Sequence, residues 1–167
     1  MIDITAYGAV GAGATDCTDA IQGALDAAAA AGETVLVPEG RFLVRGLAVP
    51  NGVRGIQGVS PASYTNHRTG SVLELRREGA AQALLDLSDC KDLFCRDLAL
   101  VGFGRGGDGG RWTPDYSLVL QGLQHSAFTG NSLWGCAMKE AVVDLGGHGE
   151  GFLFEGNAVS LATGELD

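Results

Sequence analysis

The stretch that decides the fold lies near the amino terminus and reads Tyr7-Gly-Ala-Val-Gly-Ala-Gly-Ala-Thr-Asp-Cys-Thr-Asp-Ala-Ile-Gln22. Glycines that lead into a helix often form a phosphate cradle, as in the dinucleotide-binding pattern G-x-G-x-x-G. Here the glycines are spaced Gly8-x-x-Gly11-x-Gly13, no long strand precedes them, and no acidic residue ends a second strand. The stretch is therefore predicted to be a turn into a capped helix, not a phosphate site.

The helix that follows is expected over residues 16–31. Its apolar residues recur at i, i+3, i+4 and i+7, the period of one helix face: Ile21, Ala24, Leu25 and Ala28. Thr15 or Asp16 can serve as the N-cap, and Gly32 is a natural C′ residue. Because this helix has few large side chains, we expect it to lie as a lid over another part of the fold.

After Gly32 the sequence changes to short strand-like runs, of which the earlier ones are bounded by turn residues. The runs are 34–37, 41–44, 47–49, 53–58, 71–75, 84–87, 118–120 and 142–145. No second helical period is present, so βαβ units are not expected. The chain is predicted to be all-β after its single helix.

The second half contains a repeat. Phe128-Thr-Gly-Asn131-Ser-Leu133 and Phe154-Glu-Gly-Asn157-Ala-Val159 share one pattern, and Leu93-Phe-Cys-Arg-Asp97-Leu98 is a weaker copy. Asn131 and Asn157 are 26 residues apart, whereas Leu98 and Leu133 are 35 apart. Such a period with several short strands indicates a solenoid, in which stacked coils bury their apolar faces and successive asparagines form a ladder. The longer interval is attributed to a Gly-rich insertion at 102–115.

The opening stretch resembles the amino-terminal signature of right-handed parallel β-helix proteins of the pectate-lyase-like superfamily. That superfamily includes rhamnogalacturonase- and polygalacturonase-like enzymes, epimerases and phage tailspikes. The matching residues are Tyr7-Gly8-Ala9, Gly11-Ala12-Gly13, Thr15-Asp16-Cys17-Thr18, Ala20-Ile21-Gln22, Val35-Leu-Val-Pro38-Glu-Gly40 and Phe42-Leu-Val44. Ala12 and Cys17 stand where the family commonly has Asp, which affects the local hydrogen bonding of the turn.

The resemblance implies a right-handed single-stranded parallel β-helix with an amino-terminal capping α-helix. One domain is expected over 1–167: a strand, turn and helix in 1–33, the first coils in 34–83, and repeating coils in 84–167 with the insertion at 102–115. In the family the helix covers the open end of the stack. No equivalent cover is visible at the carboxy-terminal end, where another segment or a subunit is expected.

Composition restricts the partners. The formal net charge is −9, so a nucleic acid or an acidic membrane surface is not expected as a partner. The cysteines (Cys17, Cys90, Cys95, Cys136) show neither a CxxC pair nor a zinc-ligand spacing, and buried free thiols are favoured over disulfides. No metal and no cofactor are expected. Neutral sugars, cationic ligands and other proteins remain open.

Two acids are the candidate catalytic residues. Asp86 and Asp144 each precede a leucine that is expected to face inward, so both carboxylates are expected to face outward. Val119 lies in the coil between them, which puts their backbones two rungs, roughly 9–10 Å, apart. That separation is near the upper limit of about 6.5–9.5 Å for inverting glycosidases. Outward acids with no catalytic role are the alternative, because alternation makes them common on any strand.

The insertion is the candidate binding site. An aromatic face among polar groups suits a sugar ring, and the candidate substrate-binding residues are Arg105, Arg111, Trp112, Asp115, Tyr116 and Trp134. The alternative is a loop that packs against the solenoid or a partner subunit. Residues 60–68 are a second loop of the same kind. His125 and His148 are interpreted as surface turn residues.

Two function classes follow, and a stand-alone scaffold with no ligand is a third possibility. The first is a virion structural or receptor-binding spike or fibre module that contacts cell-surface polysaccharide, located in the virion and assembled as a homotrimer or larger. The second is the amino-terminal part of an extracellular polysaccharide lyase, glycoside hydrolase or epimerase. The sequence favours the non-enzymatic class, because no signal peptide follows Met1 and the family's active-site acids lie on later coils than those present here.

Overall fold

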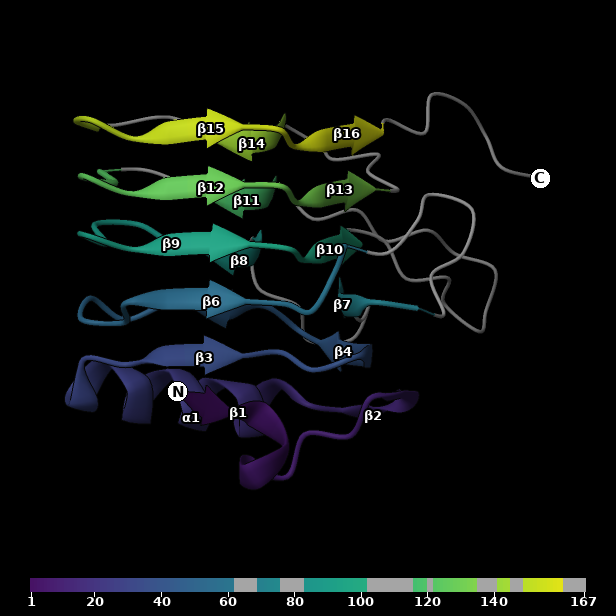
Figure 1. The fold of residues 1–167 in the computed structure, drawn as a ribbon. Helices are drawn as coiled ribbons and strands as arrows, with labels where there is room; N and C mark the ends of the chain where they lie inside the picture. Colours follow the sequence, from purple (N-terminus) through teal and green to yellow (C-terminus); the bar gives the residue numbers. More distant parts are fainter. Residues whose placement is uncertain are drawn as a thin grey trace.

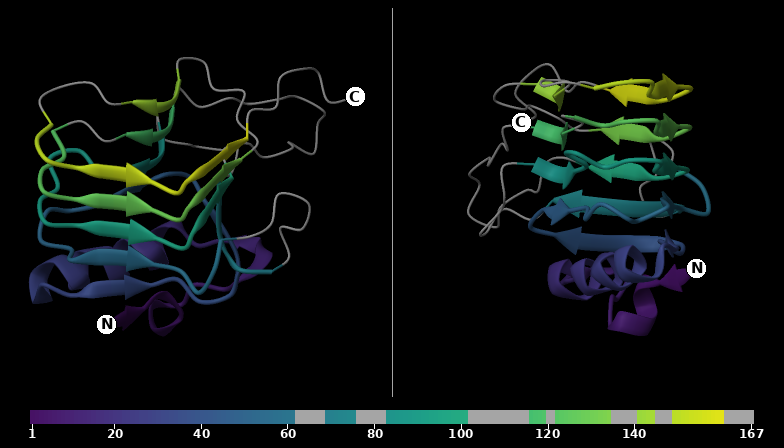
Figure 2. Two further views of the ribbon diagram at one scale, coloured as in Figure 1. Left: turned by 45° about the horizontal axis from the view of Figure 1, so that its top comes forward. Right: turned by 90° about the vertical axis from the view of Figure 1, so that its left-hand side faces the viewer.

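The computed structural model describes residues 1–61, 69–75, 83–101, 116–119, 122–134, 141–144 and 149–160. The chain winds through successive coils that stack on one another, and each coil contributes one strand to each of up to three sheets (Figure 1). Figure 2 shows the sheets as the sides of a prism, with the helix at the amino-terminal end of the stack.

The described strands form three sheets, and all the strand pairs in them are parallel. Sheet A contains β1 (Ile2–Asp3), β3 (Thr34–Leu36), β6 (Gly55–Gln57), β9 (Phe94–Arg96), β12 (Ala127–Thr129) and β15 (Leu153–Glu155). Sheet B contains β2 (Ala12–Asp16), β4 (Gly40–Val44), β7 (Ser71–Leu75), β10 (Ala99–Val101), β13 (Ser132–Trp134) and β16 (Ala158–Ser160). Sheet C contains β5 (Leu47–Ala48), β8 (Ala83–Asp86), β11 (Tyr116–Val119) and β14 (Ala141–Asp144). This is the right-handed parallel β-helix predicted from the sequence.

The predicted helix is present as α1 (Thr18–Ala31), beginning two residues later than expected. Cys17 holds the N-cap position, not Thr15 or Asp16, and its side chain makes no capping bond. The carboxylate of Asp16 instead accepts hydrogen bonds from the Thr18 backbone N–H and hydroxyl (3.0 and 2.6 Å). The helix ends as predicted at Gly32, whose φ of 64° is the left-handed conformation that glycine adopts without strain.

The predicted apolar face of α1 is buried in the core (Ile21, Ala24, Leu25 and Ala28). The helix packs on β1, β3 and β5 and on the short 3-10 helix η1 (Ile4–Tyr7). Because η1, β1 and β2 share this end of the stack with the helix, α1 covers the end only together with them (Figure 1). In the described part of the chain, no helix is long and apolar enough to span a membrane.

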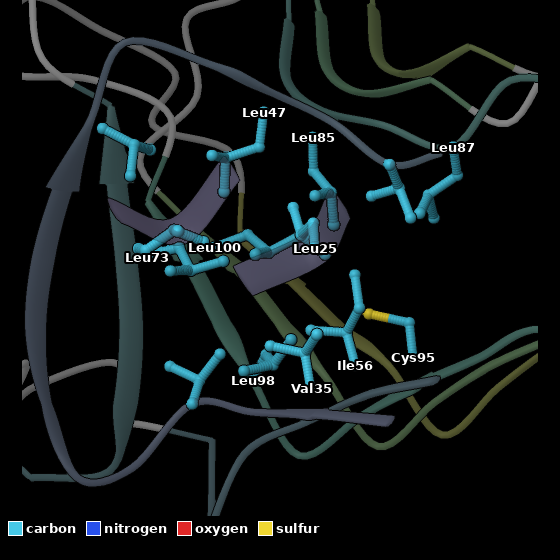
Figure 3. Close-up of a cluster of buried hydrophobic side chains, with 14 of the residues drawn as sticks. Leu25, Val35, Leu47, Ile56, Leu73, Leu85, Leu87, Cys95, Leu98 and Leu100 are labelled. Atoms are coloured by element: carbon cyan, nitrogen blue, oxygen red, sulfur yellow. The ribbon is translucent and has the colours of Figure 1, made fainter. Parts of the chain in front are cut away.

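Inward side chains form columns through the stack, as the repeat predicted. Val35, Ile56 and Cys95 occupy one register position on consecutive strands of sheet A, and all three point into the core (Figure 3). Phe128 and Phe154 continue the column, and their rings stack with centroids 5.4 Å apart. Each coil therefore buries its apolar side chains mainly against the coils above and below it.

The predicted asparagine ladder is confirmed at the corner between sheets A and B. Asn131 Oδ1 accepts from the Leu98 backbone N–H (3.1 Å), and Asn131 Nδ2 donates to the Cys95 carbonyl (3.0 Å). Asn157 Oδ1 accepts from the backbone N–H and the Nδ2 of Asn131 (2.9 and 3.1 Å). Asn157 Nδ2 donates to the Phe128 carbonyl (2.9 Å), so the bonding repeats from coil to coil.

The predicted alignment of the weaker repeat copy is wrong by two residues. Leu100, not Leu98, pairs with Leu133, so this interval is 33 residues, whereas the 26-residue interval from Leu133 to Val159 is confirmed. Leu98 lies one rung before Asn131, and the ladder begins where its backbone N–H donates to Asn131 Oδ1. The extra length falls between β10 and β11, which is where residues 102–115 lie in the sequence.

Three cysteines are buried and free, as predicted: Cys17, Cys90 and Cys95. Cys136 lies outside the described residues. Burial raises the pKa of the Cys90 thiol from 9.0 to about 11, and the charges of Asp86 and Asp89 add to the shift. Burial alone raises the pKa of Cys95.

The Cys90 and Cys95 thiols are expected to resist alkylation in the folded protein, because the thiolate is the nucleophile and burial disfavours it there. In a Cys136→Ser background, iodoacetamide at about pH 8 should label the native chain slowly and the denatured chain rapidly. Because the folded pKa of Cys90 is raised, its stabilising contribution is complete below pH 9 and is lost as the pH rises to about 11. Peptide mass spectrometry measures the labelling, and rapid labelling of native Cys95 would contradict the packing described here.

Candidate functional site

Sheet C brings the two candidate acids into one column. Val119 pairs with Asp86 on one side and with Asp144 on the other. Their backbones therefore lie two rungs apart, about 9–10 Å, as the sequence predicted. This spacing is close to the range of about 6.5–9.5 Å between the carboxyl groups of inverting glycosidases. The register is confirmed, and a catalytic role stays a prediction.

The Asp86 carboxylate is held by its own turn. The backbone N–H and the hydroxyl of Ser88 both donate to Asp86 Oδ1 (2.9 and 2.5 Å). Leu87, the next residue, is fully buried, and Asp86 itself is partly exposed on the other side of the strand. Asp3 binds Thr5 in the same way near the amino terminus. The arrangement fixes one carboxylate oxygen in a turn, and the other has no hydrogen bond from the described residues.

Variants at Asp86 separate a turn role from a chemical one. Asp86→Asn keeps an oxygen acceptor for Ser88 and is expected to cost less than about 0.5 kcal/mol of unfolding free energy, whereas Asp86→Ala should cost about 1 kcal/mol. Denaturant unfolding measures both, with Asp3→Ala as a matched turn variant outside sheet C. Equal stability of Asp86→Ala and the parent chain would contradict the turn role. Loss of polysaccharide turnover in Asp86→Asn would assign a chemical role.

Two of the candidate binding residues, Tyr116 and Trp134, belong to described strands. Arg105, Arg111, Trp112 and Asp115 lie outside the described residues. Tyr116 is the first residue of β11 in sheet C, and Trp134 is the last residue of β13 in sheet B. Trp134 pairs with Val101, the last residue of β10 and the residue that precedes the insertion. Trp134 therefore lies one rung from the point where the insertion begins. Its contribution to a binding site stays a prediction.

Of the two histidines predicted to lie in surface turns, the described part of the chain includes His125. His125 is exposed in a turn and has a φ of 47°, which agrees with its interpretation as a turn residue. His148 and residues 62–68 of the second loop lie outside the described part. Within the described ranges, no group of three or more His, Cys, Asp or Glu side chains is placed to hold a metal ion.

The outer face of sheet B has a feature that the sequence analysis missed. Val72, Ala99 and Val101 face away from the core, yet they are buried in a cluster of their own. Glu74, only 8% exposed, lies beside them and binds Arg41 through both carboxylate oxygens. This hydrogen bond is the main reason that the pKa of Arg41 is raised. The signal was visible in Ser71–Leu75 and Ala99–Val101, since largely apolar runs without alternation indicate strands buried on both faces.

Comparison with known proteins supports the resemblance. Residues 1–68 match the family model described as rhamnogalacturonase A/epimerase, pectate lyase-like. The likeness in sequence to that family covers these residues. A comparison with curated proteins found no match.

Solved structures extend the likeness to nearly the whole chain. A Parabacteroides merdae protein assigned as a glycosyl hydrolase superimposes with a TM-score of 0.66 at 14% identity, covering 95% of this chain and 74% of its own. An exopolygalacturonase from Thermotoga maritima gives a TM-score of 0.66 at 13% identity, covering 95% and 46%. The enzymatically active domain of tailspike protein 2 from bacteriophage CBA120 gives 0.64 at 13% identity, covering 95% and 25%.

At these identities the likeness establishes the fold, and activity does not follow from it. The β-helix described here spans less than half of the exopolygalacturonase and a quarter of the tailspike domain. Residues outside the shared region can therefore carry the activities of those proteins.

Proposed function

We propose that this chain is a β-helix module of a virion spike or fibre and that it contacts cell-surface polysaccharide. The observation that supports the proposal best is the agreement of fold over 95% of the chain with a phage tailspike domain and with an exopolygalacturonase. One of these is named as part of a virion and the other for its polysaccharide substrate. The proposal combines the two roles.

The geometry suits a linear polymer. Parallel strands repeat about every 4.8 Å along the stack, so each sheet presents equivalent positions at a constant step. A polysaccharide repeats its sugar units in the same manner and can contact several coils at once. Several weak contacts in a row then add to a useful affinity, as in other solenoids with extended binding surfaces.

A second candidate function is catalytic: part of a polysaccharide lyase, glycoside hydrolase or epimerase. The shared register of Asp86 and Asp144 in sheet C favours it. The hydrogen bonds from Ser88 to Asp86 favour the first candidate, because they give this acid a structural role without any substrate.

One pair of measurements tests both candidates. Binding of the full chain to a panel of acidic and neutral polysaccharides is measured by calorimetry, and each mixture is followed by absorbance of unsaturated uronates and by reducing ends. Binding without turnover supports the spike module. Turnover that is lost in Asp86→Asn supports the enzyme, and no binding to any polysaccharide would contradict both.

The assembly is tested separately. We propose a homotrimer or larger, located in the virion, with an extracellular location for the enzymatic alternative. Size-exclusion chromatography with light scattering is expected to give three times the chain mass. A monomer at micromolar concentration would contradict the trimer and would weaken the spike role, while leaving polysaccharide binding to be judged by calorimetry.

A further inference from the structure

The outer face of sheet A carries two adjacent columns of side chains. One column is mainly apolar, and in register it reads Gly55, Phe94, Ala127 and Leu153. The other is mainly polar, and it reads Gln57, Arg96, Thr129 and Glu155. No described element lies over this face (Figure 1). We call Gln57, Phe94, Arg96, Thr129 and Leu153 the sheet A strip.

Phe94 is seated in the strip by a glycine. A Cβ atom at Gly55, one rung earlier, would lie 2.4 Å from the Phe94 ring. The ring therefore occupies the space above Gly55, and it is only partly buried. Leu153, two rungs later in the same column, is 49% exposed. The column thus offers apolar surface to solvent on a rigid sheet.

Arg96 is positioned beside this apolar surface. Its guanidinium carbon lies 5.0 Å from the Phe94 ring centroid, and its Nη2 donates to Gln57 Oε1 (3.0 Å). The Arg96 side chain is nevertheless 49% exposed. Stacking and one hydrogen bond hold the planar group, and most of its five N–H donors stay without an acceptor from the described residues.

One carboxylate lies near this guanidinium, and a second belongs to a residue further along the same column. Asp97 Oδ2 lies 3.8 Å from Arg96 Nε, beyond hydrogen-bond distance, and Glu155 lies two rungs along the column. Exposed pairs of this kind contribute about 0–1 kcal/mol, so Asp97 competes weakly for the guanidinium. Arg41 differs, because two of its nitrogens bind the nearly buried Glu74. Arg96 is therefore free to take an anionic ligand, whereas Arg41 is not.

We propose that the sheet A strip binds a carboxylated glycan, with Arg96 pairing a sugar carboxylate, Phe94 contacting the apolar face of that sugar unit, and Leu153, two rungs along the column, contacting another unit of the same polymer. Arg96 presents the planar fork that matches a carboxylate bidentately. Gln57 and Thr129 flank it on the neighbouring rungs and supply groups for sugar hydroxyls. This inference rests on the proposed polysaccharide binding and adds the face and the ligand chemistry.

The test uses the full chain and two matched probes: a uronic-acid oligosaccharide and the same oligosaccharide with its carboxylates reduced to alcohols. The parent chain is expected to bind the acidic probe more tightly. Arg96→Gln should weaken that binding about tenfold or more and reduce its salt dependence, while leaving the neutral probe unchanged. Calorimetry at two salt concentrations measures both effects.

Arg54→Gln is the matched control. Arg54 is exposed, and its Nε lies 4.0 Å from where a Gly32 Cβ would be, so its side chain lies beside the end of α1. Its backbone carbonyl accepts from the Phe94 N–H (3.2 Å), and this contact does not depend on the side chain that the control replaces. The Arg54→Gln substitution removes the same charge as Arg96→Gln and should change the affinity for the acidic probe less than twofold. Phe94→Leu should weaken the binding of both probes, and circular dichroism checks that this variant is folded.

The outcomes separate this inference from the function on which it rests. Equal effects of Arg96→Gln and Arg54→Gln, or equal binding of the two probes, would overturn the sheet A strip while polysaccharide binding stands. Absence of binding by the parent chain to either probe and to the wider panel would overturn both.

Discussion

Replacing Gly58 by alanine is expected to lower the free energy of unfolding by about 3 kcal/mol or more. A Cβ atom at this position would lie 2.0 Å from the backbone oxygen of Asp97 and 2.8 Å from the Cβ of Ser71. Both neighbours belong to other strands or turns, and a backbone oxygen cannot rotate away as the end of a flexible side chain can.

The cost is large because this corner joins three coils. The Gly58 N–H donates to the Arg96 carbonyl (3.0 Å), and the Ser71 hydroxyl donates to the Val37 carbonyl (2.7 Å) while accepting from the Val59 N–H (2.9 Å). A shift that makes room for a methyl group strains these bonds together. Loss of the coil-to-coil bonds then adds to the steric cost.

Gly23→Ala is the matched control. Gly23 lies in the middle of α1, where the nearest atom to an added Cβ is Tyr7 Cδ1 at 3.5 Å, an ordinary contact. Alanine should there stabilise the helix by up to about 1 kcal/mol. Denaturant unfolding measures the free energy of unfolding relative to the parent chain, which is expected to fall for Gly58→Ala and to rise for Gly23→Ala. A Gly58→Ala protein as stable as the parent would contradict the packing described here.

Replacing Asn131 by alanine is expected to cost about 3–5 kcal/mol. Asn131 is 1% exposed, and its side chain satisfies the Leu98 N–H on one neighbouring coil and the Cys95 carbonyl. Alanine leaves that donor and that acceptor buried without partners, and each such group costs about 1–3 kcal/mol.

Asn157→Ala and Asn131→Asp are the comparisons. Asn157 lies on the last described coil and is partly exposed, so its replacement should cost less than that of Asn131. Asn131→Asp keeps the acceptor for Leu98 but loses the donor to Cys95 and buries a charge, so it should be at least as destabilising as alanine. Thermal unfolding measures the stability of these variants. If Asn131→Ala and Asn157→Ala were equally stable, the buried asparagine would contribute no more than the partly exposed one, which would contradict the expectation.

The strands and the ladder could be predicted because the solenoid repeats its physical requirements in each coil. Short runs between turn residues gave strands close to those observed, and the spacing of Asn131 and Asn157 gave the ladder. The earlier copy was misaligned because Cys95 stands where the later coils have phenylalanine. Asp97 likewise takes the left-handed position of Gly130 and Gly156, with φ of 59° against 64° and 65°. A small thiol and an aspartate in those places hide the register from a pattern search.

The candidate site was predictable only where it follows from register. The column of Asp86 and Asp144 needed only strand alternation and coil length, and it is present. The turn that Asp86 forms with Ser88 depends on side-chain geometry that alternation does not encode. The sheet A strip was missed for a similar reason, since Gly55 and Phe94 are 39 residues apart and meet only through the coil register.

We expect the parallel β-helix to present the side of its stack to a polysaccharide. Hydrogen-exchange mass spectrometry of the full chain, with and without a saturating polysaccharide from the binding panel, tests this most directly. Added protection is expected in peptides that contain β6, β9 and β12 of sheet A, one strand from each successive coil. Protection confined to residues 1–33, or no change with a polysaccharide that binds by calorimetry, would contradict it.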